Sequence, residues 1–187
     1  SGTTKPVLSV GDPSYDAPAK MDPAAERGSV FTQLGARSRY AALRGHLAPL
    51  PYTAFESAWV AEAFGKGGQA AEQLLKENAT KAKVSENVAG RRVVHLACHG
   101  LVDQSYGNFF GALALTPGPK ADTDPADDGF LTLAEIYELN LKGCELAILS
   151  ACETNFGPQQ QGEGVWALSR GFLVAGSRRV VASNWLV

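Results

Sequence analysis

The sequence predicts an α/β domain with a mainly parallel sheet and helices on both faces. Two short apolar runs that contain β-branched residues, 93–98 and 146–151, have the composition of buried parallel strands. Segments of helical periodicity alternate with these runs and with further strand candidates, as in chains that fold into parallel strands joined by helices. The length, 187 residues, suits a single domain spanning the whole chain.

The part of the chain before residue 99 is expected to supply strands and helices around a variable, proline-rich segment at about 12–50. Thr53 and Glu56 have the spacing of a capping box, which predicts a helix that begins there. Apolar residues follow at helical spacing in that segment: Phe55, Trp59, Val60, Ala63 and Phe64. The remaining expected elements are a strand at 7–10, a short helix at 37–46, a strand or turn at 71–77 and a helix at 80–89.

The second half follows the same alternation after a loop-rich stretch, 101–129, that holds one short strand at 111–116. Thr132 and Glu135 form another capping-box pattern and predict a helix, which leads into the run at 146–151. A long helix at 163–175 and a strand at 180–185 end the chain. The expected buried residues of the long helix are Val165, Trp166, Leu168, Phe172 and Leu173. Because a domain seldom ends at a core strand, more sheet or helix is expected after Val187.

Composition excludes several classes of protein. A formal net charge of −2 at pH 7 gives no electrostatic basis for binding nucleic acid or an anionic membrane. No apolar stretch approaches the roughly 20 residues of a membrane helix, and no signal-peptide core is present, so a cytoplasmic location is expected. The three cysteines are an odd number without C-x-x-C spacing, which favours reduced thiols over disulfides. We therefore expect neither a metal nor a cofactor.

A histidine and a cysteine stand at the ends of the two strongest strand candidates. His99 follows the run at 93–98, and Cys152 follows the run at 146–151. Parallel strands place their carboxyl ends at one edge of a sheet, which is where α/β proteins bind ligands. A thiol nucleophile and its base are assembled in this way, adjacent in space and distant in sequence. We therefore predict a His99–Cys152 catalytic dyad.

The remaining histidines and cysteines are expected to be structural. His95 lies inside its strand and is expected to be a hydrogen-bonded core residue, while His46 is expected at the surface. Cys98 and Cys144 fit the usual role of a free cysteine as a small buried side chain.

The backbone beside the dyad suggests an oxyanion site. Gly100 allows a tight turn and a close approach to substrate, and its N–H is expected to act as an oxyanion donor together with the N–H of Cys152.

Three sequence blocks carry a resemblance to a known family. They are HLACHG at 95–100, LSACET at 149–154, and GEGVWALSRGFL at 162–173 with Gly176 and VVAS at 180–183. In order and spacing they resemble the CHAT domain, a family of the caspase–separase clan of cysteine peptidases. The resemblance extends from about Val7 to the end of the chain. The spacing of His99 and Cys152 is also about that of caspases, roughly 50 residues.

The resemblance implies a fold and a chemistry. It implies a caspase-like three-layer α/β sandwich in which His99 is the catalytic histidine and Cys152 the nucleophile. The implied activity is that of a cysteine endopeptidase that cleaves a protein, or itself, in a bacterial regulatory or defence pathway. Because the clan works with a dyad, no third orienting residue is assigned. The family also implies partners: a protein or peptide substrate, an upstream repeat-containing or sensor protein, and a fragment that follows the last strand.

Some assignments stay open at this stage. Asp103 and Glu153 are candidates for substrate binding, and Asp103 and Asp128 for binding a basic P1 side chain, but each also fits a plain loop or surface carboxylate. A basic or small P1 residue is expected. A catalytically silent scaffold for protein–protein interaction is the alternative to the peptidase. A small-molecule hydrolase or transferase with a cysteine nucleophile is a third class, which the lack of a G-x-C-x-G elbow disfavours.

Overall fold

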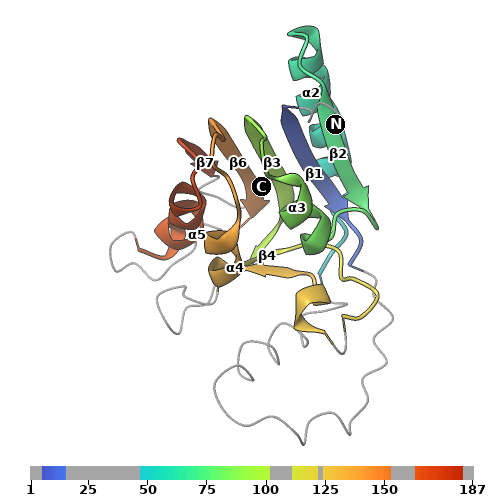
Figure 1. The fold of residues 1–187 in the computed structure, drawn as a ribbon. Coiled ribbons are helices and arrows are strands. Elements are labelled where there is room, and N and C mark those ends of the chain that lie inside the picture. The colour runs from blue at the N-terminus through green and yellow to red at the C-terminus, as the bar shows by residue number, and fades with distance from the viewer. Residues whose placement is uncertain (1–5, 16–46, 102–110, 122–123, 153–162, 183–187) are drawn as a thin grey trace, which may run out of the picture.

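The computed structural model describes residues 6–15, 47–101, 111–121, 124–152 and 163–182, with the backbone alone at 125, 152 and 163–167. These residues form one seven-stranded sheet with helices on both faces (Figure 1). The elements, in chain order, are β1 (Val7–Pro13), α2 (Tyr52–Lys66), β2 (Ala71–Lys76), α3 (Lys81–Asn87), β3 (Val93–Leu101), β4 (Ala112–Ala114), the 3-10 helix η3 (Pro125–Asp127), β5 (Phe130–Thr132), α4 (Leu133–Glu138), β6 (Leu146–Cys152), α5 (Glu163–Val174) and β7 (Val180–Ala182).

The sheet is mainly parallel, which confirms the predicted fold class. Five strands run parallel in the order β2-β1-β3-β6-β7, with β3 at the centre (Figure 1). The hairpin of β4 and β5 is attached antiparallel to the last residues of β3. Parallel pairing of β1 with β3 runs from Val7↔Val93 to Val10↔Leu96, so β4 takes the place beside β3 where this pairing ends. This arrangement is a caspase-like α/β sandwich.

One face of the sheet carries the main apolar core under α3, α4 and α5. Alternate residues of each strand point to opposite faces, and the set on this face is apolar. Close packing of α5 on α4 requires Gly171, because an added Cβ would lie 2.8 Å from Leu133 Cδ1 and 2.9 Å from Ile136 Cγ2. The fully buried members of the core include Leu8, Leu96, Leu149, Leu168 and Phe172.

The opposite face is covered by α2, which packs closely on β1. Gly11 permits this contact, since a Cβ there would lie 2.5 Å from the Thr53 carbonyl oxygen. The expected capping box at Thr53 is wrong: the helix begins at Tyr52, its N-cap is Pro51, and no side chain caps it. Instead, Thr53 Oγ1 accepts a hydrogen bond from the N–H of Asp12, at 2.7 Å. Glu56 binds a histidine of β3, described below.

The apolar residues at helical spacing on α2 are only partly buried or exposed. Phe55 and Trp59 are 60% and 68% exposed, and the neighbouring Tyr52 is 82% exposed. The residue that α2 buries is Ser57, whose hydroxyl accepts a hydrogen bond from Ser9 of β1. The helix is therefore placed by polar contacts with the sheet rather than by its aromatic residues.

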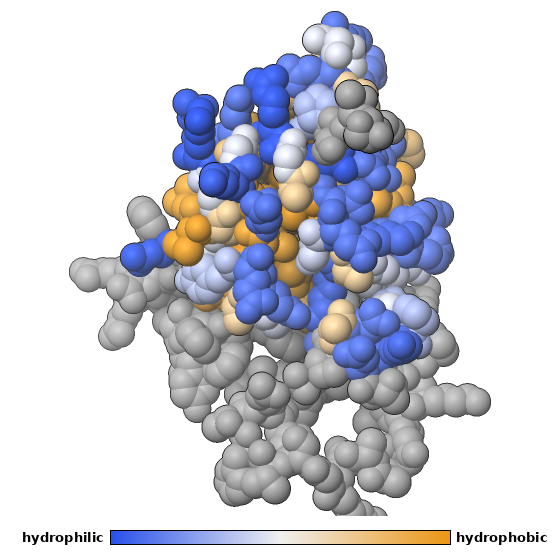
Figure 2. Space-filling view, viewed as in Figure 1, coloured by the Kyte–Doolittle hydropathy of each residue, from blue (hydrophilic) through white to orange (hydrophobic). Residues whose placement is uncertain are grey.

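Most other predicted elements are confirmed, with small changes. The sheet contains 71–76 as an edge strand, and the helices that Thr80 and Thr132 were expected to start do begin there. Leu173 is 45% exposed, so its predicted burial is wrong. It lies with exposed Val174 on α5, over which apolar surface is visible in Figure 2. The expected helix at 37–46 lies outside the described residues, as do the side chains of Val165 and Trp166, whose backbone belongs to α5.

None of the helices in the described ranges has the length and apolar character that a membrane crossing needs.

Candidate active site

Strands β3 and β6 bring the two predicted catalytic positions together. Their parallel register runs without a break from Val93↔Leu146 to His99↔Cys152. His99 and Cys152 are thus backbone neighbours at the last pair of this ladder. Both were expected just past their strands, but they lie inside them, and β3 continues to Leu101 because β4 supplies a new antiparallel partner there.

A row of paired residues crosses the sheet at this level. Cys152 pairs with His99, His99 with Ala114 of β4, and Ala114 with Phe130 of β5. The phenol of Tyr15 reinforces the row, since its Oη accepts the His99 N–H and donates to the Ala114 carbonyl, each at 3.2 Å. Burial raises the pKa of Tyr15 far above its usual value, so the phenol keeps the proton that it donates.

The imidazole of His99 is oriented by a backbone carbonyl. Its Nε2 lies 2.8 Å from the carbonyl oxygen of Ala48, and because a carbonyl only accepts, Nε2 carries the hydrogen. The neutral ring then has its lone pair on Nδ1. The Tyr15 ring lies beside the imidazole, with centroids 5.2 Å apart and planes tilted by 44°. No side chain was assigned this orienting role from the sequence, and the group that fills it is main chain.

Hydrogen bonds to α2 and apolar packing on the sheet hold the segment around Ala48 in place. The Leu50 carbonyl accepts from both Thr53 N, at 3.0 Å, and Thr53 Oγ1, at 2.7 Å. Leu47 and Leu50 pack against a small apolar cluster that includes Tyr15 and Phe130. The prolines on either side of Leu50 restrict the chain further. The segment that orients His99 is therefore fixed by α2, Tyr15 and the β4–β5 hairpin together.

A buried polar network lies on the dyad's side of the sheet, farther down the strands. His95, 1% exposed, has Nδ1 at 2.8 Å from Ser9 Oγ and Nε2 at 3.0 Å from Glu56 Oε1. Ser9 Oγ donates to Ser57 Oγ at 2.8 Å, and the Ser150 hydroxyl hydrogen-bonds Glu56. The hydrogen bond from His95 lowers the pKa of Glu56 below its usual value, which keeps the carboxylate ionised. His95 is thus a core histidine, as predicted.

The other cysteines are also structural, as predicted. Cys98 is 1% exposed, belongs to the apolar core, and has its pKa raised to about 12 by burial, which makes it a poor nucleophile. Cys144 is fully buried, and its thiol donates to the Leu146 carbonyl at 3.4 Å.

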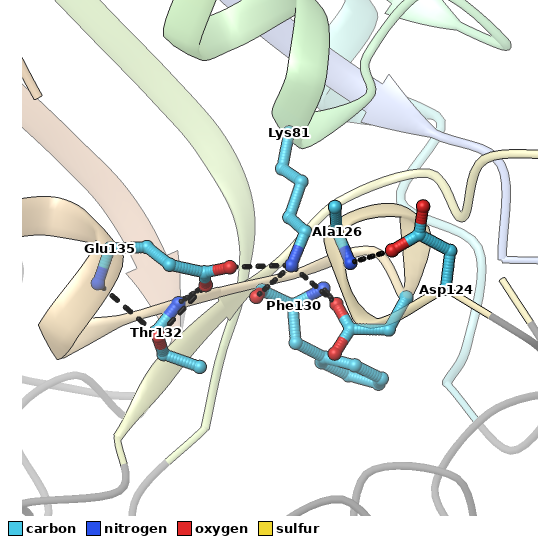
Figure 3. A network of polar contacts seen from close by, with 7 residues as sticks. Lys81, Asp124, Ala126, Phe130, Thr132 and Glu135 are labelled. Atoms are coloured by element: carbon cyan, nitrogen blue, oxygen red, sulfur yellow. Dashed lines mark hydrogen bonds and ion pairs between the residues drawn. The ribbon is translucent and has the colours of Figure 1, made fainter. Parts of the chain in front are cut away.

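The β4–β5 hairpin is joined to the helices by a buried lysine (Figure 3). Lys81 Nζ lies 2.8 Å from Asp128 Oδ1 and 2.7 Å from Glu135 Oε1, and it donates to the Phe130 carbonyl at 3.4 Å. Glu135 also completes the predicted capping box with Thr132. Because the Asp128 side chain is only 14% exposed and paired, its candidacy for binding a basic substrate is wrong.

The remaining predicted site residues divide into two groups. Gly100 is buried in β3 and pairs with Leu113. Asp103 and Glu153, named for substrate binding, lie outside the described residues, as does His46. Among the described residues, no group of three or more His, Cys, Asp or Glu side chains could hold a metal ion.

Comparison with known proteins agrees with this architecture. No curated protein matches the chain significantly. The sequence model of the CHAT domain matches residues 1–187. The CHAT domain has a caspase-like, peptidase-related fold, and the mainly parallel sheet with helices on both faces agrees with that fold. With its whole length matched, the chain belongs to the CHAT domain family.

Proposed function

We propose that the chain is a cysteine endopeptidase that uses a His99–Cys152 dyad to cleave a protein substrate or itself. The observation that carries the proposal is the register His99↔Cys152, together with an imidazole held through Nε2 by the Ala48 carbonyl. This hydrogen bond leaves Nδ1 as the nitrogen that can take a proton. Within the described part of the chain, Nδ1 has no hydrogen-bond partner of its own.

The chemistry follows from these two groups. His99 Nδ1 accepts the proton of the Cys152 thiol, and the thiolate attacks the carbonyl carbon of the scissile peptide bond. The Ala48 carbonyl stabilises the imidazolium through its Nε2 hydrogen. Nδ1 then gives its proton to the leaving amine as the C–N bond breaks, which leaves a thioester on Cys152. Water hydrolyses the thioester with His99 again acting as base.

Backbone geometry supports the proposed oxyanion donors. Successive N–H groups of a strand point to opposite sides. The His99 N–H is directed toward Tyr15 and β4, so the Gly100 N–H belongs to the side of β6 and Cys152. Together with the N–H of Cys152, it is suited to hold the negative oxygen of the tetrahedral intermediate.

Labelling with peptidyl acyloxymethyl ketones, read by intact mass, tests the proposal. We expect wild type to gain one label on Cys152, and Cys152→Ala to gain none. His99→Ala should label at least about 100-fold more slowly, because general-base assistance is worth that much. Cys98→Ala is the control, since its thiol is buried and should not affect labelling.

Equal labelling of wild type and Cys152→Ala would refute the nucleophile. A folded wild-type chain that reacts with none of the peptidyl probes would favour the alternative function, a catalytically silent scaffold for protein–protein interaction. The proposed setting, a bacterial regulatory or defence pathway, rests on the family and needs cleavage of a partner in cells for its test.

A further inference from the structure

The carboxylate of Glu56 lies close to the proposed nucleophile without belonging to the dyad. It reaches from α2 to His95 Nε2, at 3.0 Å, and to the hydroxyl of Ser150. Ser150 is two residues before Cys152 on β6, and alternate residues of a strand share a face. The two positions are therefore separated by about 7 Å along the strand.

The carboxylate is built as a fixed anion. His95 is 1% exposed and its imidazole is held from the other side by Ser9 Oγ, at 2.8 Å, so the donor to Glu56 cannot rotate away. Two donors set the direction of the carboxyl group, and a carboxylate can accept further hydrogen bonds beyond these. Anions that are positioned in advance bind cations without the entropy cost of ordering them.

The anion is accessible, and no lysine or arginine of the described ranges is paired with it. The Glu56 side chain is 35% exposed, in contrast to the 1% of its partner His95. In the described ranges Glu56 forms no ion pair with a lysine or arginine, whereas Glu72, Asp128, Glu135 and Glu145 all do. Glu56 thus differs from these carboxylates in being oriented and yet open to a cation from outside.

We propose that Glu56 determines specificity by binding a lysine or arginine side chain at P1, the substrate residue whose carbonyl carbon Cys152 attacks. The inference rests on the proposed function and adds the substrate class to it. A long basic side chain spans roughly the distance from a carbonyl at Cys152 to a carboxylate at the level of Ser150. An acidic P1 side chain would be repelled, and an apolar one would add no hydrogen-bond donor to the exposed part of the carboxylate.

Matched substrates test the proposal directly. We would measure kcat/KM for fluorogenic peptides, and labelling rates for acyloxymethyl ketones, that differ only at P1: arginine, lysine, ornithine, norleucine or aspartate. Wild type should prefer arginine and lysine to norleucine by about 10-fold or more, as expected for a charge-assisted hydrogen bond. Preference should fall as the side chain is shortened from lysine to ornithine, and it should weaken with added salt.

Variants of α2 provide the controls. Glu56→Gln keeps an oxygen for His95 but removes the charge, so we expect the rate on basic P1 to fall about 10-fold and the rate on norleucine to change little. Glu56→Asp should retain part of the basic preference. Glu62→Gln removes a 61% exposed carboxylate from the same helix and should leave the preference unchanged.

The outcomes separate this inference from the proposed function. If Cys152 is labelled as fast by norleucine as by lysine probes, Glu56 does not select substrate, and the peptidase proposal stands. If Glu56→Gln slows all P1 residues equally, its role is structural and the inference is wrong. If no probe labels Cys152, the proposed function fails and the inference fails with it.

Discussion

The two faces of the central strand β3 differ in polarity: one is apolar and the other carries two histidines. Val94, Leu96 and Cys98 point into the apolar core, where each is 1% exposed or less. His95 and His99 occupy the other face and make polar contacts with α2 and the segment before it. One strand thus supplies a hydrophobic surface on one face and polar side chains on the other, because its side chains alternate.

The difference indicates how stability and chemistry are divided. The apolar face, packed under three helices, removes most of the large side chains from water and so provides most of the free energy of folding. The polar face is organised by hydrogen bonds whose net contribution is small but whose geometry is specific. Substitutions on the two faces should therefore separate loss of stability from loss of activity.

The largest loss of stability is expected on the apolar face. Phe172→Ala removes a fully buried ring from α5 and should lower the free energy of unfolding by about 4 kcal/mol, since a cavity remains. The labelling rate per folded molecule should stay the same. Urea unfolding measures the change in the free energy of unfolding. Leu173→Ala, at an exposed position of the same helix, is the control. A loss below about 1 kcal/mol would contradict the prediction, because it would mean that neighbouring side chains fill the space left by the ring.

A second large effect is expected at Lys81. Lys81→Met leaves the carboxylates of Asp128 and Glu135 without their shared cation and should lower the free energy of unfolding by about 3 kcal/mol. Because Lys81 also binds the Phe130 carbonyl, the hairpin beside His99 should exchange its amide hydrogens faster. Lys83→Met, a change at an exposed contact of the same helix, is the control. Equal stability of the two variants would contradict the prediction.

A smaller change in stability with a larger change in activity is expected at Tyr15. Tyr15→Phe removes the hydroxyl that links His99 N to the Ala114 carbonyl, and should lower the free energy of unfolding by about 1 kcal/mol. The labelling rate of Cys152 should fall as well, because His99 loses a backbone restraint. Tyr137→Phe, at a 42% exposed position, controls for the substitution. An unchanged rate would place Tyr15 outside the site.

The smallest effect is a pH dependence at Glu56. The hydrogen bond from His95 lowers the pKa of this carboxyl below its ordinary value of 4.5, so its contribution to stability is complete above that pH. It is lost as pH falls through the lowered pKa. The difference in unfolding free energy between wild type and Glu56→Gln should therefore be constant near neutral pH and shrink below pH 4.5. A difference that grows on acidification would give the opposite sign and exclude this interpretation.

Two identical sequence patterns show what could be predicted from sequence and what could not. Thr53 with Glu56 and Thr132 with Glu135 share the T-x-x-E spacing of a capping box. The second forms one, and the first does not, because Thr53 binds β1 and Glu56 binds His95, 39 positions away. Strands and helices follow from local periodicity, whereas the partners of a polar side chain depend on contacts between distant segments.

In the candidate active site, too, some features follow from local sequence and others depend on contacts between distant segments. The positions of His99 and Cys152 follow from two apolar runs that end together in a parallel sheet, and the register agrees. The roles of Tyr15 and Glu56 depend on where a loop and a helix pack on the far side of β1. No spacing of residue types encodes that packing, so Tyr15 did not stand out in the sequence and Glu56 did so only as part of a capping-box pattern.

The hydrogen bond from His99 to Ala48 has a consequence for how this site can vary. The acceptor is a main-chain oxygen, so every amino acid at position 48 supplies the same group. Side-chain substitutions at position 48 therefore keep this acceptor and should be tolerated, and an alanine scan would not detect its role. What must persist is the path of the chain from Leu47 to Pro51, held by its prolines and by Thr53. Orientation of the His99 imidazole is thus encoded in a loop shape rather than in a side-chain identity.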